Sequence, residues 1–485
     1  MTRHGLKDPS LFIEKAYVGG GWQDAVSGNT LDVDNPSNGQ TIGTIAACGA
    51  VETNAAIAAA DTAFKSYRKT TAEQRAALLE RWYDLVIENL DDLARIMTLE
   101  QGKPLAEAAG EVRYGASFIK WFAEEARRVN GYTIPSPSQD RRIIALKEPV
   151  GVSAAITPWN FPIAMITRKC APALAVGCPI IVKPSELTPY SALALALLAE
   201  RAGFPRGTLS VITGLPQEIG AALTGSETVR KLSFTGSTRV GALLMEQCAG
   251  TIKRLSLELG GNAPFIVFDD ADLDLAVAGV MASKFRNAGQ TCVCANRVLV
   301  QNGIYERFAA RLLEEVAKLS VGDGLNSGSN LGPLINGAAV EKVRAHTTDA
   351  LAKGGSLLTR ETPDDAGRFV TPIVIGNATV DMRLANEETF GPLVPLFRFD
   401  TDEEAIEIAN STPFGLASYF YTQDLKRSWR VAEALEFGMV GLNTGSVSME
   451  VAPFGGVKQS GLGREGAQVG IDEYLETKSF HIAGL

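Results

Sequence analysis

A cysteine in the middle of the chain lies in surroundings that favour a nucleophile. Residues 285–297 read FRNAGQTCVCANR, which places Cys292 after a glycine-containing turn and between Arg286 and Arg297. Positive surroundings lower a thiol pKa, and the thiolate is the reactive form, so Cys292 is predicted to attack an electrophilic carbon. A cysteine is more often a packing residue, and the C-x-C spacing to Cys294 also permits half of a metal site. Partner ligands are missing from the sequence, so no metal is predicted.

A carboxylate and an amide supply two further reactive groups. Glu258 precedes two glycines in the segment LELGGN at the end of a predicted strand. Glycines let a ligand approach the backbone closely, and a carboxylate beside them is suited to act as a general base. A glutamate that caps a helix would give the same sequence pattern. Asn160 stands in PWNFP, where rigid prolines would aim its amide at a developing oxyanion; a loop amide that satisfies backbone groups is the alternative. The three histidines lie outside these motifs, so a Ser-His-Asp triad and a zinc cluster are not expected.

Two segments suit a dinucleotide. Gly236 and Ser237 begin a helix in FTGSTRVG, where free N–H groups and the helix dipole favour a phosphate. Lys183 and Glu186 follow a buried strand in KPSE, and an acid at that place can accept both ribose hydroxyls. Each signal is weak alone, since the G-x-G-x-x-G fingerprint is absent there and a solvated loop pair would look similar.

The elements that position these residues alternate between strand and helix. Predicted strands cover 152–156, 180–182, 209–212 and 231–234, with helices such as 191–201 between them, and a second alternating region runs from 263 to about 430. This pattern predicts an α/β fold of doubly wound parallel sheets, which bind ligands at the carboxyl ends of their strands. The first third of the chain is mainly helical.

Composition excludes several classes of protein. The chain has 485 residues, enough for roughly three structural units, and a net charge of −9, which gives no footprint for nucleic acid. Its six cysteines are too sparse for a disulfide framework. Neither a secretory signal nor an apolar run long enough to span a membrane is visible, so a cytoplasmic protein is predicted.

Taken in order, the motifs resemble those of the NAD(P)-dependent aldehyde dehydrogenases over nearly the whole chain. The ordered set is PWNFP (158–162), KPSE (183–186), FTGS (234–237), ELGG (258–261), QTC (290–292), EETFGP (387–392) and PFGG (453–456). Within that superfamily, the segments around 256–272, 284–296 and 458–465 look most like succinate-semialdehyde dehydrogenases.

The resemblance implies an aldehyde dehydrogenase-like α/β fold with two doubly wound parallel-sheet domains and a small β oligomerisation arm. Residues 1–130 and 150–257 would form the dinucleotide-binding domain and 258–455 the catalytic domain. Residues 131–149 and 456–485 would form a bridging and oligomerisation arm, through which relatives assemble as homodimers or homotetramers.

The resemblance also assigns roles to residues. Cys292 would be the nucleophile, Glu258 the general base, and Asn160 with the Cys292 backbone N–H the oxyanion hole. The positions that would hold the dinucleotide are Thr157, Trp159, Lys183, Glu186, Gly236, Ser237, Leu259, Glu388 and Phe390. NAD is the expected coenzyme because Glu186 would repel a 2′-phosphate, with NADP as the alternative.

A four-carbon substrate that ends in a carboxylate calls for cations near the thiol, and Arg168, Arg286 and Ser448 match the residues that grip it in the subfamily. Alternatives are a glutarate-semialdehyde or broader ω-oxo-acid dehydrogenase, a Cys-dependent amidase or acyltransferase, and a non-catalytic protein of the same fold. Cys294 is either a redox partner of Cys292 or a small packing residue.

Overall fold

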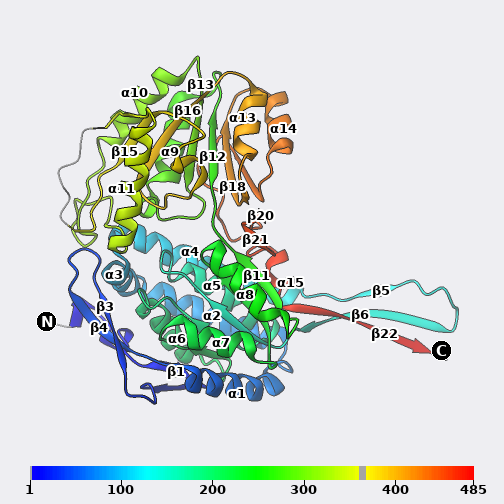
Figure 1. Cartoon of the computed structure of the whole chain (residues 1–485). Helices are drawn as coiled ribbons and strands as arrows, with labels where there is room; N and C mark the ends of the chain where they lie inside the picture. Colours follow the sequence, from blue (N-terminus) through cyan, green and yellow to red (C-terminus); the bar gives the residue numbers. More distant parts are fainter. Residues whose placement is uncertain (1–2, 360–366, 485) are drawn as a thin grey trace.

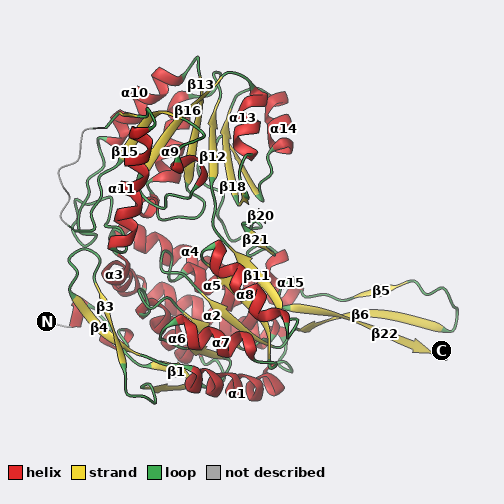
Figure 2. Ribbon diagram, viewed as in Figure 1, coloured by secondary structure: helices red, strands yellow, loops and turns green. Residues whose placement is uncertain are grey.

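A computed structural model describes residues 3–359 and 367–484. Two lobes, each built on a mainly parallel sheet, lie one above the other, and a thin β arm projects from the side of the lower lobe (Figures 1 and 2). The two lobes confirm the predicted fold class of doubly wound α/β domains with a β arm.

The lower lobe contains an eight-stranded sheet. Its strands, in spatial order, are β2 (Gly21–Gln23), β1 (Ala16–Val18), β9 (Leu209–Val211), β8 (Ile180–Lys183), β7 (Val152–Ile156), β10 (Val229–Thr235), β11 (Arg254–Glu258) and β21 (Gly461–Leu462). The strands from β9 to β11 run parallel, and antiparallel partners close both edges.

Alternating side chains explain why helices cover both faces of this sheet. In β7, Ala154 packs in one apolar cluster with α1, α7 and α8, while Ala155 packs in another with the helices from α2 to α6. Ile181 and Val182 divide between the same two clusters, as the two-residue period of a strand requires. The helices are α1 (Ala50–Tyr67), α2 (Ala72–Glu88), α3 (Leu90–Gln101), α4 (Leu105–Glu125), α5 (Ala164–Val176), α6 (Tyr190–Ala202), α7 (Pro216–Gly225) and α8 (Thr238–Ala249).

The upper lobe contains a seven-stranded sheet. Its order is β14 (Ser356–Leu357), β15 (Ile373–Ala378), β16 (Leu393–Phe399), β13 (Ala295–Gln301), β12 (Ala263–Val267), β18 (Ala417–Tyr421) and β19 (Met439–Leu442). All neighbours are parallel except β14 and β15. Its helices are α9 (Leu273–Lys284), α10 (Tyr305–Val316), α11 (Gly337–Ala352), α12 (Arg383–Asn386), α13 (Asp402–Asn410) and α14 (Leu425–Ala434).

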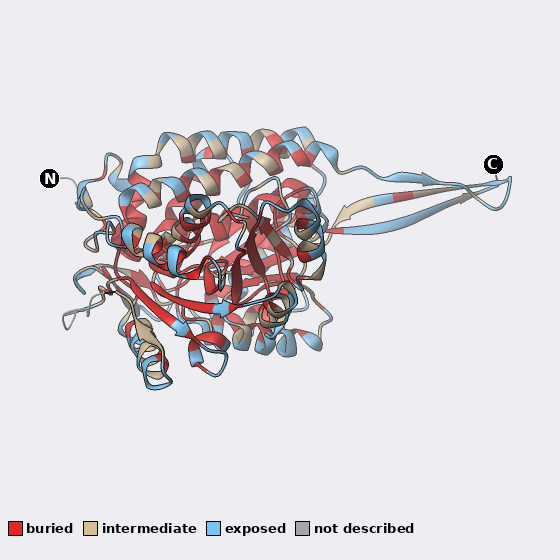
Figure 3. Cartoon of the chain, turned by 90° about the horizontal axis from the view of Figure 1, so that it is seen from above, coloured by how far each residue is buried: buried red, intermediate tan, exposed pale blue. Residues whose placement is uncertain are grey.

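The arm is a three-stranded antiparallel sheet of β22 (Leu475–Ala483), β6 (Arg141–Pro149) and β5 (Tyr132–Ile134). It extends away from the body, and most of its residues are exposed (Figure 3). Exposed apolar side chains on it include Tyr132 and Phe480. Such a sheet has little core of its own.

The C-terminal segment has two parts. Residues 456–474 contact the body, because β21 pairs with β11, β20 (Val457–Lys458) pairs with β17 (Phe414–Gly415), and α15 (Val469–Asp472) packs on α5. Only the last strand, β22, joins the arm. A further small sheet pairs β3 (Thr30–Asp34) with β4 (Thr41–Ala46). Among the described residues, no helix is long and apolar enough to cross a membrane.

Candidate active site

The predicted site residues meet where the two lobes face each other. The ends of neighbouring parallel strands of the lower sheet present Thr157 after β7, Gly236 after β10 and Glu258 at the end of β11. Cys292 comes from the upper lobe, on the loop between α9 and β13. The site therefore lies at the carboxyl edge of a parallel sheet, as expected for this fold.

A cleft of about 380 Å³ lies at this junction. Its lining includes Trp159, Asn160, Gly236, Ser237, Leu259, Cys292, Glu388 and Phe390, all predicted from the sequence. The rings of Trp159 and Phe390 meet edge to face with centroids 5.6 Å apart. The cleft thus brings the proposed nucleophile and most of the expected dinucleotide-binding residues together.

The surroundings of the Cys292 thiol differ from the prediction. Burial, with smaller contributions from Glu388 and Glu258, raises its pKa to about 12 against the opposing effect of Arg168. Arg297 lies beside Cys292 in sequence only, because its guanidinium bonds the backbone carbonyls of Asn262, Ile408 and Ala409. The expectation that the flanking arginines lower the thiol pKa is therefore wrong for the ligand-free protein.

Glu258 is a buried carboxylate inside a cluster of charges. Burial raises its pKa well above the ordinary value, with Glu465 as the next cause, while Arg168 and Lys169 act in the opposite direction. Its Oε2 has no hydrogen-bond partner among the described residues. A side chain at Gly455 would approach its Oε1 to 2.9 Å, so a glycine there leaves room for the carboxylate. A free oxygen and a raised pKa suit a general base.

Glu465 ties this cluster together. Its Oε1 accepts a hydrogen bond from Lys169 Nζ, and its Oε2 forms an ion pair with Arg168 Nε at 2.7 Å. Burial opposes its ionisation, but Lys169 and Arg168 outweigh burial and lower its pKa. Arg168 is therefore an internal partner of Glu465, and only its Nη2 is left without a partner among the described residues.

Asn160 is buried and held on both sides. Its Nδ2 donates to the Gln290 carbonyl at 3.0 Å, which leaves the second N–H of the amide for another acceptor. The backbone carbonyl of Asn160 accepts a hydrogen bond from Asn287 Nδ2 at 3.0 Å. The loop with Asn287 has three consecutive residues with positive φ, Asn287 (51°), Ala288 (54°) and Gly289 (76°). A Cβ at Gly289 would approach the Gly391 carbonyl to 2.3 Å, so this tight loop requires glycine.

A second hollow, of about 230 Å³, lies near the loop that carries Cys292. It is lined by Arg286, Thr291, Val293 and Ser448 among others. The Arg286 guanidinium lies 4.8 Å from the centroid of the Phe161 ring and has no hydrogen bond or ion pair among the described residues. A half-buried arginine without an acidic partner is suited to bind an anion.

Tyr114 connects these groups, and the sequence analysis missed it. Burial raises the pKa of its phenol, whereas Arg168, Arg286 and a hydrogen bond from Ser448 lower it. Tyr114 therefore lies beside all three predicted substrate-binding residues. Its place on an amphipathic helix, α4, is typical of a core aromatic, so the sequence offers no signal for this role.

Comparison with known proteins identifies the family. The profile of the aldehyde dehydrogenase family matches residues 22–480. The glutarate-semialdehyde dehydrogenase of Pseudomonas putida is 59% identical over 473 residues, 98% of this chain and 98% of that protein. The succinate-semialdehyde dehydrogenase GabD of Escherichia coli, named as NADP(+)-dependent, is 57% identical over 474 residues, again 98% of each.

The crystal structure of succinate-semialdehyde dehydrogenase from Burkholderia pseudomallei has a TM-score of 0.98 and 60% identity, and the match covers 99% of this chain and 100% of that one. The chain belongs to the aldehyde dehydrogenase family.

The residues of this aldehyde dehydrogenase fit an NAD(P) coenzyme. Beside the cleft, the buried hydroxyl of Thr157 has no partner among the described residues. Lys183 Nζ donates to Glu186 Oε2 at 2.7 Å, and the Glu186 side chain remains 34% exposed. Ser237 caps α8, whose first turn presents N–H groups toward the cleft. Lys342 of α11 also lines the cleft, and no sequence motif pointed to it.

Cys294 is buried away from the cleft lining. Its Sγ donates to the Gly289 carbonyl at 3.4 Å and lies 3.9 Å from Lys284 Nζ. All six cysteines are free thiols. Cys294 is thus both a packed side chain and a near neighbour of Cys292 in the chain, and this structure leaves both predicted roles open to test.

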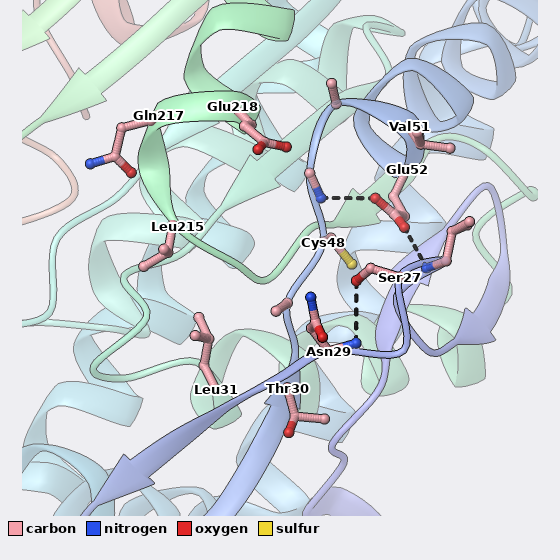
Figure 4. A pocket seen from close by; sticks show the side chains of 14 residues that line it. Ser27, Asn29, Thr30, Leu31, Cys48, Val51, Glu52, Leu215, Gln217 and Glu218 are labelled. Atoms are coloured by element: carbon pink, nitrogen blue, oxygen red, sulfur yellow. Dashed lines mark hydrogen bonds between the residues drawn. The ribbon is translucent and has the colours of Figure 1, made fainter.

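Another hollow lies away from the cleft. It has a volume of about 710 Å³ and is lined by the starts of α1 and α7 and by residues from the segment 26–31. Figure 4 shows that Glu52 turns back to its own helix start, where its two oxygens accept from Gly49 N and Val26 N. Burial, with Glu52, raises the pKa of Cys48 to about 12. None of the residues predicted for catalysis or for dinucleotide binding lines this hollow, so it does not compete with the cleft as the active site.

Proposed function

We propose that this enzyme oxidises succinate semialdehyde to succinate with NAD(P). The observation that carries the proposal is that Cys292 lines one hollow while its chain neighbours Thr291 and Val293 line another. One is the cleft with the dinucleotide-binding residues, and the other holds Arg286 and Ser448, which suit a carboxylate. The relatives' names, succinate-semialdehyde and glutarate-semialdehyde dehydrogenase, support an aldehyde with a distant carboxylate as substrate.

The chemistry begins at the thiol. Cys292 Sγ, after losing its proton, attacks the aldehyde carbon and forms a thiohemiacetal whose oxyanion accepts from the free N–H of Asn160 and from the Cys292 backbone N–H. When NAD(P) is bound in the cleft, its nicotinamide ring is the hydride acceptor. The hydride departure leaves a thioester on Cys292. Glu258 then takes a proton from a water molecule, the hydroxide attacks the thioester carbon, and succinate and the free thiol are released.

A pKa of about 12 leaves little thiolate at neutral pH. Activation of Cys292 therefore requires a base or a bound positive charge. Glu258, which has a free oxygen and a raised pKa, is the candidate acceptor for the thiol proton.

We propose NAD as the preferred coenzyme. The partly exposed Glu186 carboxylate would accept the ribose hydroxyls and repel a 2′-phosphate. The Escherichia coli relative is named as NADP(+)-dependent, so the preference needs a direct test. A comparison of kcat/KM for NAD and NADP decides it: a higher value for NADP would overturn the argument from Glu186.

The second candidate substrate is glutarate semialdehyde, which the Pseudomonas putida relative's name favours. One methylene is worth about 1–3 kcal/mol in a pocket, so the two substrates should differ by at least several-fold in kcat/KM. A series of ω-oxo acids with four, five and six carbons tests the assignment. A maximum at five carbons would transfer the proposal to glutarate semialdehyde.

The arm supports a homo-oligomer, a homodimer or homotetramer. Its three strands expose Tyr132, Ile134 and Phe480 and have little core, so contact with a second subunit would stabilise them. Sedimentation of the wild type and of a triple Tyr132→Ser, Ile134→Ser, Phe480→Ser variant tests this. A monomeric wild type would overturn the proposal, and a triple variant that keeps the same assembly would remove these side chains from the interface.

A further inference from the structure

A buried ion pair lies directly behind Asn160. Lys103 stands between α3 and α4, its side chain is 1% exposed, and its Nζ contacts Glu111 Oε2 of α4, whose side chain is also 1% exposed. The same Nζ donates to the Asn160 carbonyl at 2.8 Å and lies 4.1 Å from the centroid of the Phe161 ring. The ammonium thus contacts Glu111 and the loop that presents the Asn160 amide, and Glu107 and Arg286 also act on its charge.

Glu111 fixes the far end of the same loop. Its Oε1 accepts from Ile163 N at 3.0 Å and from Ala164 N at 3.3 Å, where α5 begins. The loop from Asn160 to Ala164 is thus held at one end by Lys103 and at the other by Glu111. Two neighbouring contacts on one short loop leave it little freedom to move.

One turn earlier on α4, Glu107 holds the opposite loop. Its Oε2 accepts from Asn287 N at 2.9 Å. Asn287 in turn donates from Nδ2 to the Asn160 carbonyl, and Gln290, whose carbonyl accepts from the Asn160 amide, donates from Nε2 to the Asn287 carbonyl at 3.1 Å. Residues four apart lie on one face of a helix, so a single face of α4 contacts both loops.

We propose that the Lys103–Glu111 pair is a positioning device that sets the direction of the Asn160 amide relative to Cys292. Neither residue lines the cleft or the second hollow, and the pair acts through the Asn160 backbone carbonyl. The inference rests on the proposed function, because it assumes that the Asn160 amide stabilises the oxyanion.

Buried ion pairs are costly to build, and removal of one partner leaves an uncompensated charge. Burial lowers the pKa of Lys103, opposed by Glu111 and Glu107. Hydrophobic residues would fill the same volume without that cost, whereas only a charged donor with a fixed acceptor holds a carbonyl in one direction. The geometry therefore favours a role in alignment over a role in stability.

The test compares Lys103→Met and Glu111→Gln with a matched control. Glu100→Gln removes another buried carboxylate, one that accepts from Tyr190 N and Ser191 N at the start of α6, away from both catalytic loops. Loss of an oxyanion donor costs about 10²–10³-fold in kcat, so a misdirected donor should cost about 10–100-fold. The aldehyde KM and the affinity for NADH should change less than about threefold, and Glu100→Gln should keep the wild-type kcat.

A double-mutant cycle with Asn160→Ala separates alignment from general damage. If Lys103 acts through Asn160, then Lys103→Met or Glu111→Gln should lower kcat by less than about twofold in the Asn160→Ala background. The inference would be overturned if these substitutions lowered kcat in the Asn160→Ala background by the same factor as in the wild type. It would also be overturned if both single variants had the same kcat as Glu100→Gln. If Lys103→Met does not fold, as judged by its thermal melt, Glu111→Gln decides alone, since its amide oxygen still caps α5.

The outcome for Asn160→Ala alone tests the underlying assumption. A wild-type kcat for that variant would overturn the oxyanion role in the proposed function. A large loss for Asn160→Ala with unchanged Lys103 and Glu111 variants would overturn only the positioning role.

Discussion

Replacement of Arg286 should separate recognition of the carboxylate from the chemistry at the thiol. The Arg286 guanidinium lies in the hollow beside Cys292 without an acidic partner among the described residues, so its loss breaks no internal ion pair. Arg286→Met keeps much of the apolar stem that packs near Phe161. The variant should therefore fold normally and lose one charged contact to the substrate.

The magnitude follows from the kind of contact. Truncation of one partner of a buried, hydrogen-bonded charge pair costs about 2–5 kcal/mol. Arg286 is half-buried and Ser448 offers a second donor, so a value of about 3 kcal/mol is appropriate, which corresponds to roughly 10²-fold in kcat/KM. Butanal has the same chain length and no carboxylate, so its kcat/KM should change less than about threefold.

The assay follows NADH formation with both aldehydes for the wild type, Arg286→Met and Arg286→Lys. The lysine variant keeps the charge without the planar fork and should fall between the other two. Arg307→Met, on an exposed face of α10, serves as the control for loss of a surface arginine. Equal losses for succinate semialdehyde and butanal would refute the assignment of Arg286 to the carboxylate.

Further predictions concern the base, the thiols and a buried acid. Glu258→Gln should release about one equivalent of NADH per active site and then stop, because the thioester on Cys292 is no longer hydrolysed; a normal steady-state rate in stopped-flow experiments would contradict this. The pKa of Glu258 is raised, so its basic form becomes populated only at a pH well above the ordinary range for glutamate. The rate of thioester hydrolysis should therefore increase with pH in that range. A rate that is constant from pH 5 to 9 would argue against Glu258 as the base. After mild peroxide treatment, dithiothreitol should restore the wild type but not Cys294→Ser, and equal recovery would remove Cys294 as the redox partner of Cys292. Burial raises the pKa of Glu100 to about 8, so the folded state holds a proton that the unfolded state releases. Between the unfolded and the folded pKa of Glu100, the free energy of unfolding of the wild type should therefore fall by up to about 1.4 kcal/mol per pH unit relative to that of Glu100→Gln. Thermal melts of the two proteins with the same pH dependence would contradict this.

The fold could be predicted from the sequence because its signals are local. Short apolar strands alternate with helices, and a local T-x-x-Q pattern, Thr71 to Gln74, forms the capping box at the start of α2. The motif residues at strand ends meet because parallel strands end at one edge of a sheet. The local sequence pattern therefore predicts both the architecture and the edge of the sheet at which the site lies.

The electrostatics could not be predicted in the same way, because neighbours in sequence are not neighbours in space. Arg297 turns into the upper lobe toward backbone carbonyls, and Cys292 instead meets Glu388 and Glu258. Lys103 and Glu111 show no motif at all, since their partners come from loops about 50 and more residues away. Their arrangement depends on tertiary packing, which a single sequence does not display.

The two hollows near the Cys292 loop suggest a way to block the enzyme. A molecule that joins a short carboxyalkyl tail to a nicotinamide-like ring is designed to occupy both. Such a bisubstrate inhibitor should compete with aldehyde and coenzyme alike, and its affinity should gain from the linkage itself, because the second half binds at a high effective concentration.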